Sequence, residues 1–175
     1  MNERRRQDRR LFKRLLHAHM SLDHAACCVR QILGRNLHDS PRGREDSRLL
    51  RCLNTALIVS YASPFSRNTG SEDVAPSLPG KYLDVLDPAE RSFHDRIVEA
   101  RNRDHAHSDP LSLSVRVSVE RVFGEILVTP IGRDPFAPLE RDDVERLQAI
   151  LEKLMLRIQV EQQRLAKTFT PDEEF

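Results

Sequence analysis

Apolar residues recur at steps of three and four along four stretches of this chain, a spacing that is typical of amphipathic helices. The expected helices cover residues 5–34, from 46 or 47 to 63, from 88 to about 105, and 140–166. Ser21 is a residue type that often caps a helix start, so the first stretch forms either one helix or two. Each stretch has one apolar stripe, and packing these stripes around a single core is the simplest way to bury them.

The pattern changes to a period of two between residues 111 and 119. Every second residue there is Leu or Val, and the residues between them are polar or charged. That alternation predicts a β-strand, and residues 122–129 form its expected partner, with Gly124 at a turn or bulge. A two-stranded hairpin is not stable by itself, so we expect it to pack on the helices.

The clearest helix start lies immediately before the third helix. Asp87 is a natural N-cap, Pro88 suits the first helical position, and Glu90 completes a capping box. Pro110 is unfavourable within a helix, so we expect this helix to reach Arg101 and to end between residues 105 and 109.

These elements predict a mainly α-helical protein, a bundle of four or five helices with an inserted β-hairpin near residues 111–129. The chain has 175 residues and is expected to form a single domain. Residues 63–80 contain three prolines and two glycines, which predicts a long mobile loop. Residues 168–175 are expected to be a frayed tail.

Composition narrows the class of protein. No apolar run approaches the roughly 18–20 residues of a membrane span, and the arginine-rich start lacks the apolar core of a secretory signal. The three cysteines, Cys27, Cys28 and Cys52, are odd in number and lack the spacing of a zinc site. This pattern indicates that the cysteines are small buried side chains in a protein of a reducing compartment. We therefore expect a cytoplasmic protein with no membrane partner.

Charge is distributed unevenly along the chain. Residues 1–51 contain 13 Lys or Arg against 6 Asp or Glu, whereas residues 52–175 contain 15 against 21. The basic part favours an anionic partner such as nucleic acid, or it is a solvated helix face that pairs with the acidic part. The arginine-rich residues 4–14 are the expected source of sequence-independent RNA affinity.

One polar cluster, residues 101–109, concentrates groups that suit phosphoryl transfer. Its charged and polar members are Arg101, Asn102, Arg103, Asp104, His105, His107, Ser108 and Asp109. Arginine stabilises charge that develops on a phosphate, and histidine exchanges protons near neutral pH. The alternative is a local network of ion pairs that caps the helix end. In an ideal α-helix Arg101 shares a face with His105, whereas His107 lies about 120° away.

The spacing from Arg101 to His107 resembles the Arg-x(4–6)-His signature of HEPN domains, the higher-eukaryote and prokaryote nucleotide-binding helical bundles. The longer string Arg101-Asn102-Arg103 followed by Ala106-His107-Ser108-Asp109 is similar to a form found in abortive-infection-associated members. The segment 58–65 also resembles a helix end in that group, in which arginine is more frequent at the position of Ser63. The match covers about a tenth of the chain.

The resemblance implies a homodimer in which the motif helices of two chains meet at a cleft that includes helix 88–107. It implies a metal-independent endoribonuclease without a cofactor, such as a toxin or phage-defence component, with Arg101 and His107 as the catalytic pair and Asn102 orienting them. The accessory neighbours are Asp104, His105, Ser108 and Asp109. The alternative is a catalytically inactive homodimeric module that binds a nucleotide or an antitoxin-like protein. The hairpin after the motif departs from the plain bundle of the family.

Overall fold

A computed structural model describes residues 3–39, 44–66, 77–105, 116–122, 125–131 and 137–169 of the chain. The α-helices of this part are α1 (Glu3–Gly34), α2 (Arg44–Ala62), α3 (Pro88–Ala100) and α4 (Arg141–Ala166). A two-stranded antiparallel sheet, β1 (Arg116–Val122) and β2 (Glu125–Ile131), precedes α4. The predicted mainly α-helical bundle with an inserted hairpin is confirmed.

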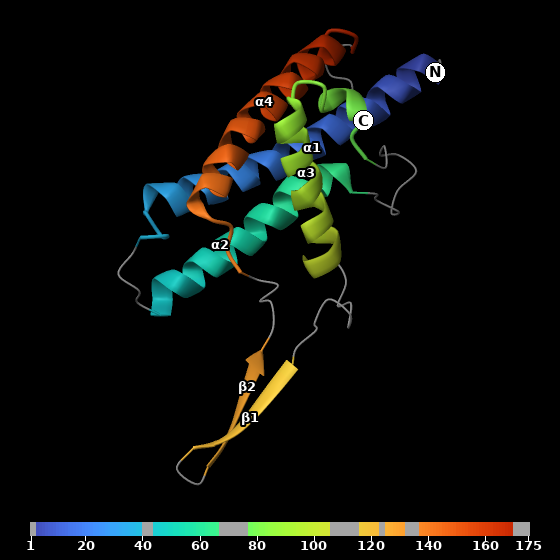
Figure 1. Cartoon of the computed structure of the whole chain (residues 1–175). Helices are drawn as coiled ribbons and strands as arrows, with labels where there is room; N and C mark the ends of the chain where they lie inside the picture. Colours follow the sequence, from blue (N-terminus) through green and yellow to red (C-terminus); the bar gives the residue numbers. More distant parts are fainter. Residues whose placement is uncertain are drawn as a thin grey trace.

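Helix α1 lies at the centre of the packing, with α4 along one side and α2 along another (Figure 1). The rings of Phe12 in α1 and Phe169 after α4 are 5.3 Å apart, so the start of α1 lies beside the end of α4. The first stretch is one helix that continues through Ser21. Fully buried large side chains from all four helices form one core: Leu15, Leu22, Ile32, Leu57, Tyr61, Ile97, Leu147, Ile150, Leu151, Leu154 and Ile158.

Helix α3 begins at the predicted capping box. Asp87 Oδ1 accepts a hydrogen bond from the Glu90 amide at 2.8 Å, and Glu90 Oε2 accepts from the Asp87 amide at 3.0 Å. Glu90 also holds Lys153 of α4, at 2.6 Å. The box therefore fixes where α3 starts and ties that start to α4.

Replacing Asp87 with alanine removes an acceptor from the first turn of α3. We expect the free energy of unfolding to fall by about 1 kcal/mol, which is typical for the loss of an N-cap side chain. Urea denaturation measures this change. Asp84→Ala is the matched control, because Asp84 is an exposed carboxylate that lies outside the box. Equal losses in the two variants would contradict the capping role.

The predicted loop at residues 63–80 contains ordered ends. Ser63–Phe65 forms a 3-10 turn, η1, and the Leu78 amide donates to the Pro64 carbonyl at 2.9 Å. Pro64 and Leu78 are both buried. Residues 67–76 lie outside the described part, so the predicted mobility stays a prediction for them. In the predicted frayed tail, Thr168 bonds to the Leu165 carbonyl and Phe169 packs on Phe12, while residues 170–175 lie outside the described part.

The hairpin is present in the predicted region near residues 111–129. β1 begins at Arg116 and β2 ends at Ile131, while residues 111–115 are outside the described part. The expectation that the hairpin packs on the helices is wrong for the described residues. Val119 is 65% exposed and Val128 is 58% exposed. Figure 1 shows the two strands projecting away from the helices.

Candidate functional site

The candidate site begins where α3 changes its helical geometry. Residues Arg101–His105 form a π-helical turn, η3, directly after Ala100. The Arg101 amide donates to both the Ile97 and Val98 carbonyls, which marks the last regular α-turn. A π-turn closes from residue i to i+5 and is wider than an α-turn, and such turns are frequent at functional sites. The π-turn therefore places positions 101 and 105 within one widened turn at the end of the helix.

Arg101 and Asn102 are in direct contact. Nη1 of Arg101 donates to Oδ1 of Asn102 at 3.1 Å. Arg101 is half-buried, and its Nε is a buried atom without a hydrogen-bond partner among the described residues. Asn102 and Arg103 are exposed. Asn102 thus holds one arm of the guanidinium at the surface. The role that the family resemblance implies for it, orienting Arg101 and His107, stays a prediction.

The structure describes only part of the predicted cluster. The backbone of Asp104 and His105 belongs to η3, but their side chains are outside the description. His107, Ser108 and Asp109 lie outside the described residues altogether. The predicted contact of Arg101 with a histidine stays a prediction.

A buried Tyr–His pair fixes α3 on α2 two turns before Arg101. Tyr61 Oη and His94 Nδ1 are 2.8 Å apart, and the ring of Phe65 meets His94 edge-on at 4.5 Å. Burial raises the pKa of Tyr61 and lowers the pKa of His94 to about 4. Both groups are therefore neutral at pH 7, with the phenol as donor and Nδ1 as acceptor. His94 packs inside the protein and does not face a ligand.

One arginine of the arginine-rich start of the chain does not lie on the surface. Arg14 is buried, its pKa is lowered by burial, and it donates to the carbonyls of Ser63, at 3.3 Å, and Pro64. It fixes the η1 turn, so the predicted RNA role of residues 4–14 is wrong at this position. Figure 1 shows α3 running away from the start of α1 towards η3.

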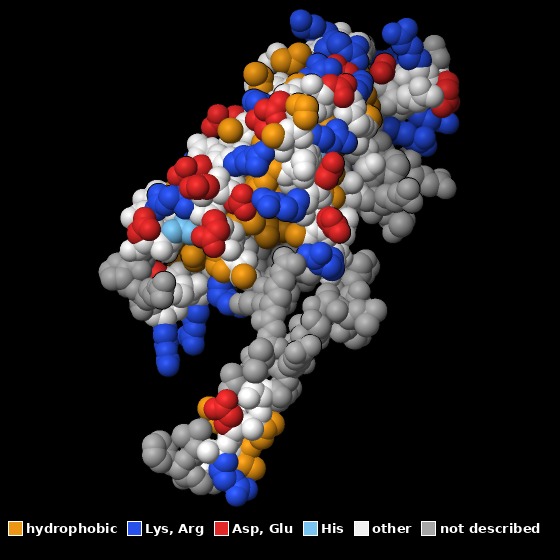
Figure 2. Space-filling view, viewed as in Figure 1, with side chains coloured by type: hydrophobic (Ala, Val, Ile, Leu, Met, Phe, Trp, Pro, Cys, Tyr) orange, Lys and Arg blue, Asp and Glu red, His pale blue; other side chains and the backbone are white. Residues whose placement is uncertain are grey.

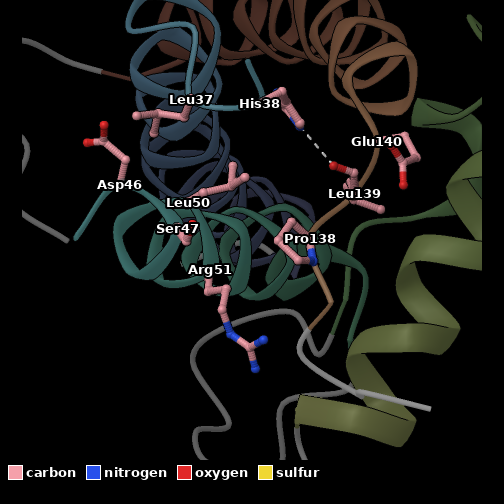
Figure 3. Close-up of a pocket in the computed structure, with 9 residues that line it drawn as sticks. All are labelled: Leu37, His38, Asp46, Ser47, Leu50, Arg51, Pro138, Leu139 and Glu140. Carbon is pink, nitrogen blue, oxygen red and sulfur yellow. Dashed lines mark hydrogen bonds between the residues drawn. The ribbon is translucent and has the colours of Figure 1, made fainter. Parts of the chain in front are cut away.

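A separate pocket lies between the end of α1 and the starts of α2 and α4 (Figure 3). It has a volume of about 360 Å³, and His38 Nε2 donates to the Leu139 carbonyl at 3.0 Å within it. The Leu139 amide in turn donates to Oδ1 of buried Asn54 at 3.0 Å. Arg51 points away from the other lining side chains. These bonds join the segment after α1 and the middle of α2 to the residues just before α4, so His38 and Asn54 have structural roles.

The three cysteines differ in their exposure. Cys28 is buried and its pKa is raised by burial, but Cys27 and Cys52 are exposed, which corrects the expectation that all three are buried. Within the described ranges, no three His, Cys, Asp or Glu side chains group closely enough to hold a metal ion. None of the helices in those ranges has the length and apolar character needed to span a membrane.

No family model, curated protein or solved structure matches this chain. Sequence reasoning missed Arg14 and Asn54 and gave Tyr61 no role. The residues next to Arg14 and Asn54 in the sequence do not reveal that these side chains are buried. Their hydrogen-bond partners are backbone carbonyls and amides that are distant in the sequence.

Proposed function

We propose that this chain is a metal-independent endoribonuclease of the HEPN type that acts in the cytoplasm as a toxin or phage-defence component. The observation that supports the proposal is the Arg101–Asn102 contact at the π-helical end of α3. An oriented guanidinium at a helix end is suited to bind a phosphate, because it offers several donors in a planar fork.

In the proposed reaction the ribose 2′-oxygen attacks the adjacent phosphorus. His107 either removes the proton from the 2′-hydroxyl or gives a proton to the departing 5′-oxygen, and water carries out the other proton transfer. Arg101 stabilises the charge of the pentacovalent phosphate, and Asn102 keeps its guanidinium in place. The P–O5′ bond breaks, which leaves a 2′,3′-cyclic phosphate and a free 5′-hydroxyl. No cofactor takes part, and Asp104, His105, Ser108 and Asp109 are accessory neighbours.

The proposed protein is a homodimer in which the region of residues 88–107 contributes to the shared site. Supporting this, Asn102 and Arg103 are exposed at the end of α3 and are accessible to a second chain or to RNA. A protein partner of the antitoxin type would act by covering the same helix end.

A second candidate function is a catalytically inactive interaction module. The observation that favours it is the projecting hairpin, where Val119, Ile126 and Val128 lie on one face and are each more than half exposed. Exposed apolar side chains that lie together are typical of a surface that binds another protein. Activity on RNA separates the two functions.

The test is cleavage of total RNA by the purified chain in the presence of EDTA. We expect cleavage to persist in EDTA and the products to end in 2′,3′-cyclic phosphates, because the proposed reaction uses the 2′-oxygen in place of a metal-bound water. Cleavage that EDTA abolishes and Mg²⁺ restores would contradict the metal-independent mechanism. A wild-type protein that leaves RNA intact would favour the interaction module.

A further inference from the structure

The two faces of the hairpin differ in character. In the antiparallel register Val119 lies opposite Val128, and Arg121 lies opposite Ile126, so these four residues share one face. The other face carries Ser118 and, opposite each other, Glu120 and Leu127. We call the first set, Val119, Arg121, Ile126 and Val128, the apolar hairpin face. Its three aliphatic side chains are 58–65% exposed.

The described helices do not cover this face, whose aliphatic side chains are exposed. Figure 2 shows hydrophobic side chains at the surface of the projecting hairpin. Among the described residues, the hairpin strands have extensive contacts only with each other. A two-stranded hairpin gains stability when one face packs against another surface, so the apolar hairpin face is suited to dock elsewhere.

A surface that can accept this face lies on α2. A hollow of about 550 Å³ is lined by Arg51, Cys52, Thr55, Ala56 and Val59, and we call it the α2 hollow. Its residues span eight helical steps, or about 12 Å along α2. The apolar hairpin face spans two strand steps, or about 7 Å. The face therefore fits within the length of the hollow.

Charges at one end of each surface are complementary. Glu45 precedes Cys52 by seven residues and Ala56 by eleven, so it lies on the same face of α2, beyond the start of the hollow. Arg121 lies at the tip end of the apolar hairpin face, next to the turn between β1 and β2. A hairpin that points its tip towards the start of α2 brings these opposite charges together.

We propose that the apolar hairpin face of one chain docks in the α2 hollow of a second copy, and that the second copy reciprocates. A second copy fits because both complementary surfaces belong to the same chain. In a two-fold symmetric dimer, each copy covers the apolar hairpin face and the α2 hollow of the other. The aliphatic side chains of one copy then face Cys52 and Ala56 of the other, and Arg121 reaches towards Glu45. This docking does not depend on whether the chain cleaves RNA.

The exposed Cys52 in the hollow allows a direct test by crosslinking. In a Cys27→Ser background, Val128→Cys places a thiol on the apolar hairpin face. Mild oxidation is expected to produce a disulfide-linked dimer that disappears when Cys52→Ser is added. The matched control is Leu127→Cys, which places a thiol on the opposite face at a site that is also about half exposed (52%), and this variant is expected to remain monomeric on a non-reducing gel.

Three results would overturn the proposal. They are equal crosslinking of the two hairpin variants, a dimer that survives Cys52→Ser, and a disulfide that forms within one chain. A second measurement does not depend on oxidation: Val119→Glu should weaken self-association about ten-fold or more in sedimentation, whereas Ser118→Glu on the opposite face should leave it nearly unchanged. Unchanged association in Val119→Glu would also contradict the docking. Circular dichroism confirms that the helices remain folded in each variant.

Discussion

Arg101→Ala should lower the rate of RNA cleavage about 10²-fold or more, because the variant loses the guanidinium that stabilises charge on the reacting phosphate. His107→Ala should lower it on a similar scale, as expected for the loss of a general acid or base. Single-turnover cleavage of a labelled RNA measures both effects. Arg101 is only half-buried, so the bundle should remain folded in this variant.

Arg91→Ala is the matched control for this prediction. Arg91 is an arginine of the same helix whose side chain is 42% exposed and pairs with Asp95, at 3.4 Å. Exposed pairs of this kind contribute little, so the variant should cleave RNA at nearly the wild-type rate. His105→Ala should have a smaller effect than His107→Ala. If His105→Ala abolishes cleavage and His107→Ala does not, His105 is the functional histidine; full activity of Arg101→Ala would refute the proposed site.

The second large effect is a loss of stability at mildly acidic pH, caused by buried His94. Its pKa is about 4 in the folded chain, against a usual value of 6.5, so only the unfolded chain binds a proton between these values. Lowering the pH from 7.5 to 5 should therefore reduce the free energy of unfolding by about 2 kcal/mol through this residue alone. Urea denaturation at the two pH values measures the change.

The variant His94→Leu keeps an apolar group in the same place and removes the titration. It is expected to be less stable at pH 7.5, because the Tyr61 hydroxyl loses its acceptor. Between pH 7.5 and 5, the free energy of unfolding of the wild type should fall by about 2 kcal/mol more than that of this variant, which has no histidine to titrate at this position. His17→Gln, at an exposed position of α1, should behave as the wild type. Parallel pH dependence in His94→Leu and the wild type would contradict the role assigned to His94.

The sequence predicted the helices well, because their boundaries depend on neighbouring residues. The capping box at Asp87 and Glu90 is a contact over three residues, and it is present as predicted. The apolar stripe of the last helix is equally local, and Val144, Leu147, Leu151, Leu154 and Ile158 are all buried. A repeat of three and four specifies a buried face whatever the partner helix is.

The candidate site was predictable in part. The motif pointed to the end of α3, and the structure shows a contact there between Arg101 and Asn102; the catalytic and orienting roles stay predictions. The change from α- to π-helical geometry at Arg101 was not predictable from the spacing of the motif.

By itself the sequence determined the helical periodicity, the start of α3, the existence of a hairpin and the position of the polar cluster, since each depends on residues only a few positions apart. Only the tertiary structure decided that Arg14 and His94 are buried, that Cys27 and Cys52 are exposed, and that the hairpin projects from the bundle. The reason is that burial depends on partners from distant parts of the chain. Arg14 donates to carbonyls 49 and 50 residues away, and Tyr61 and His94 are 33 residues apart.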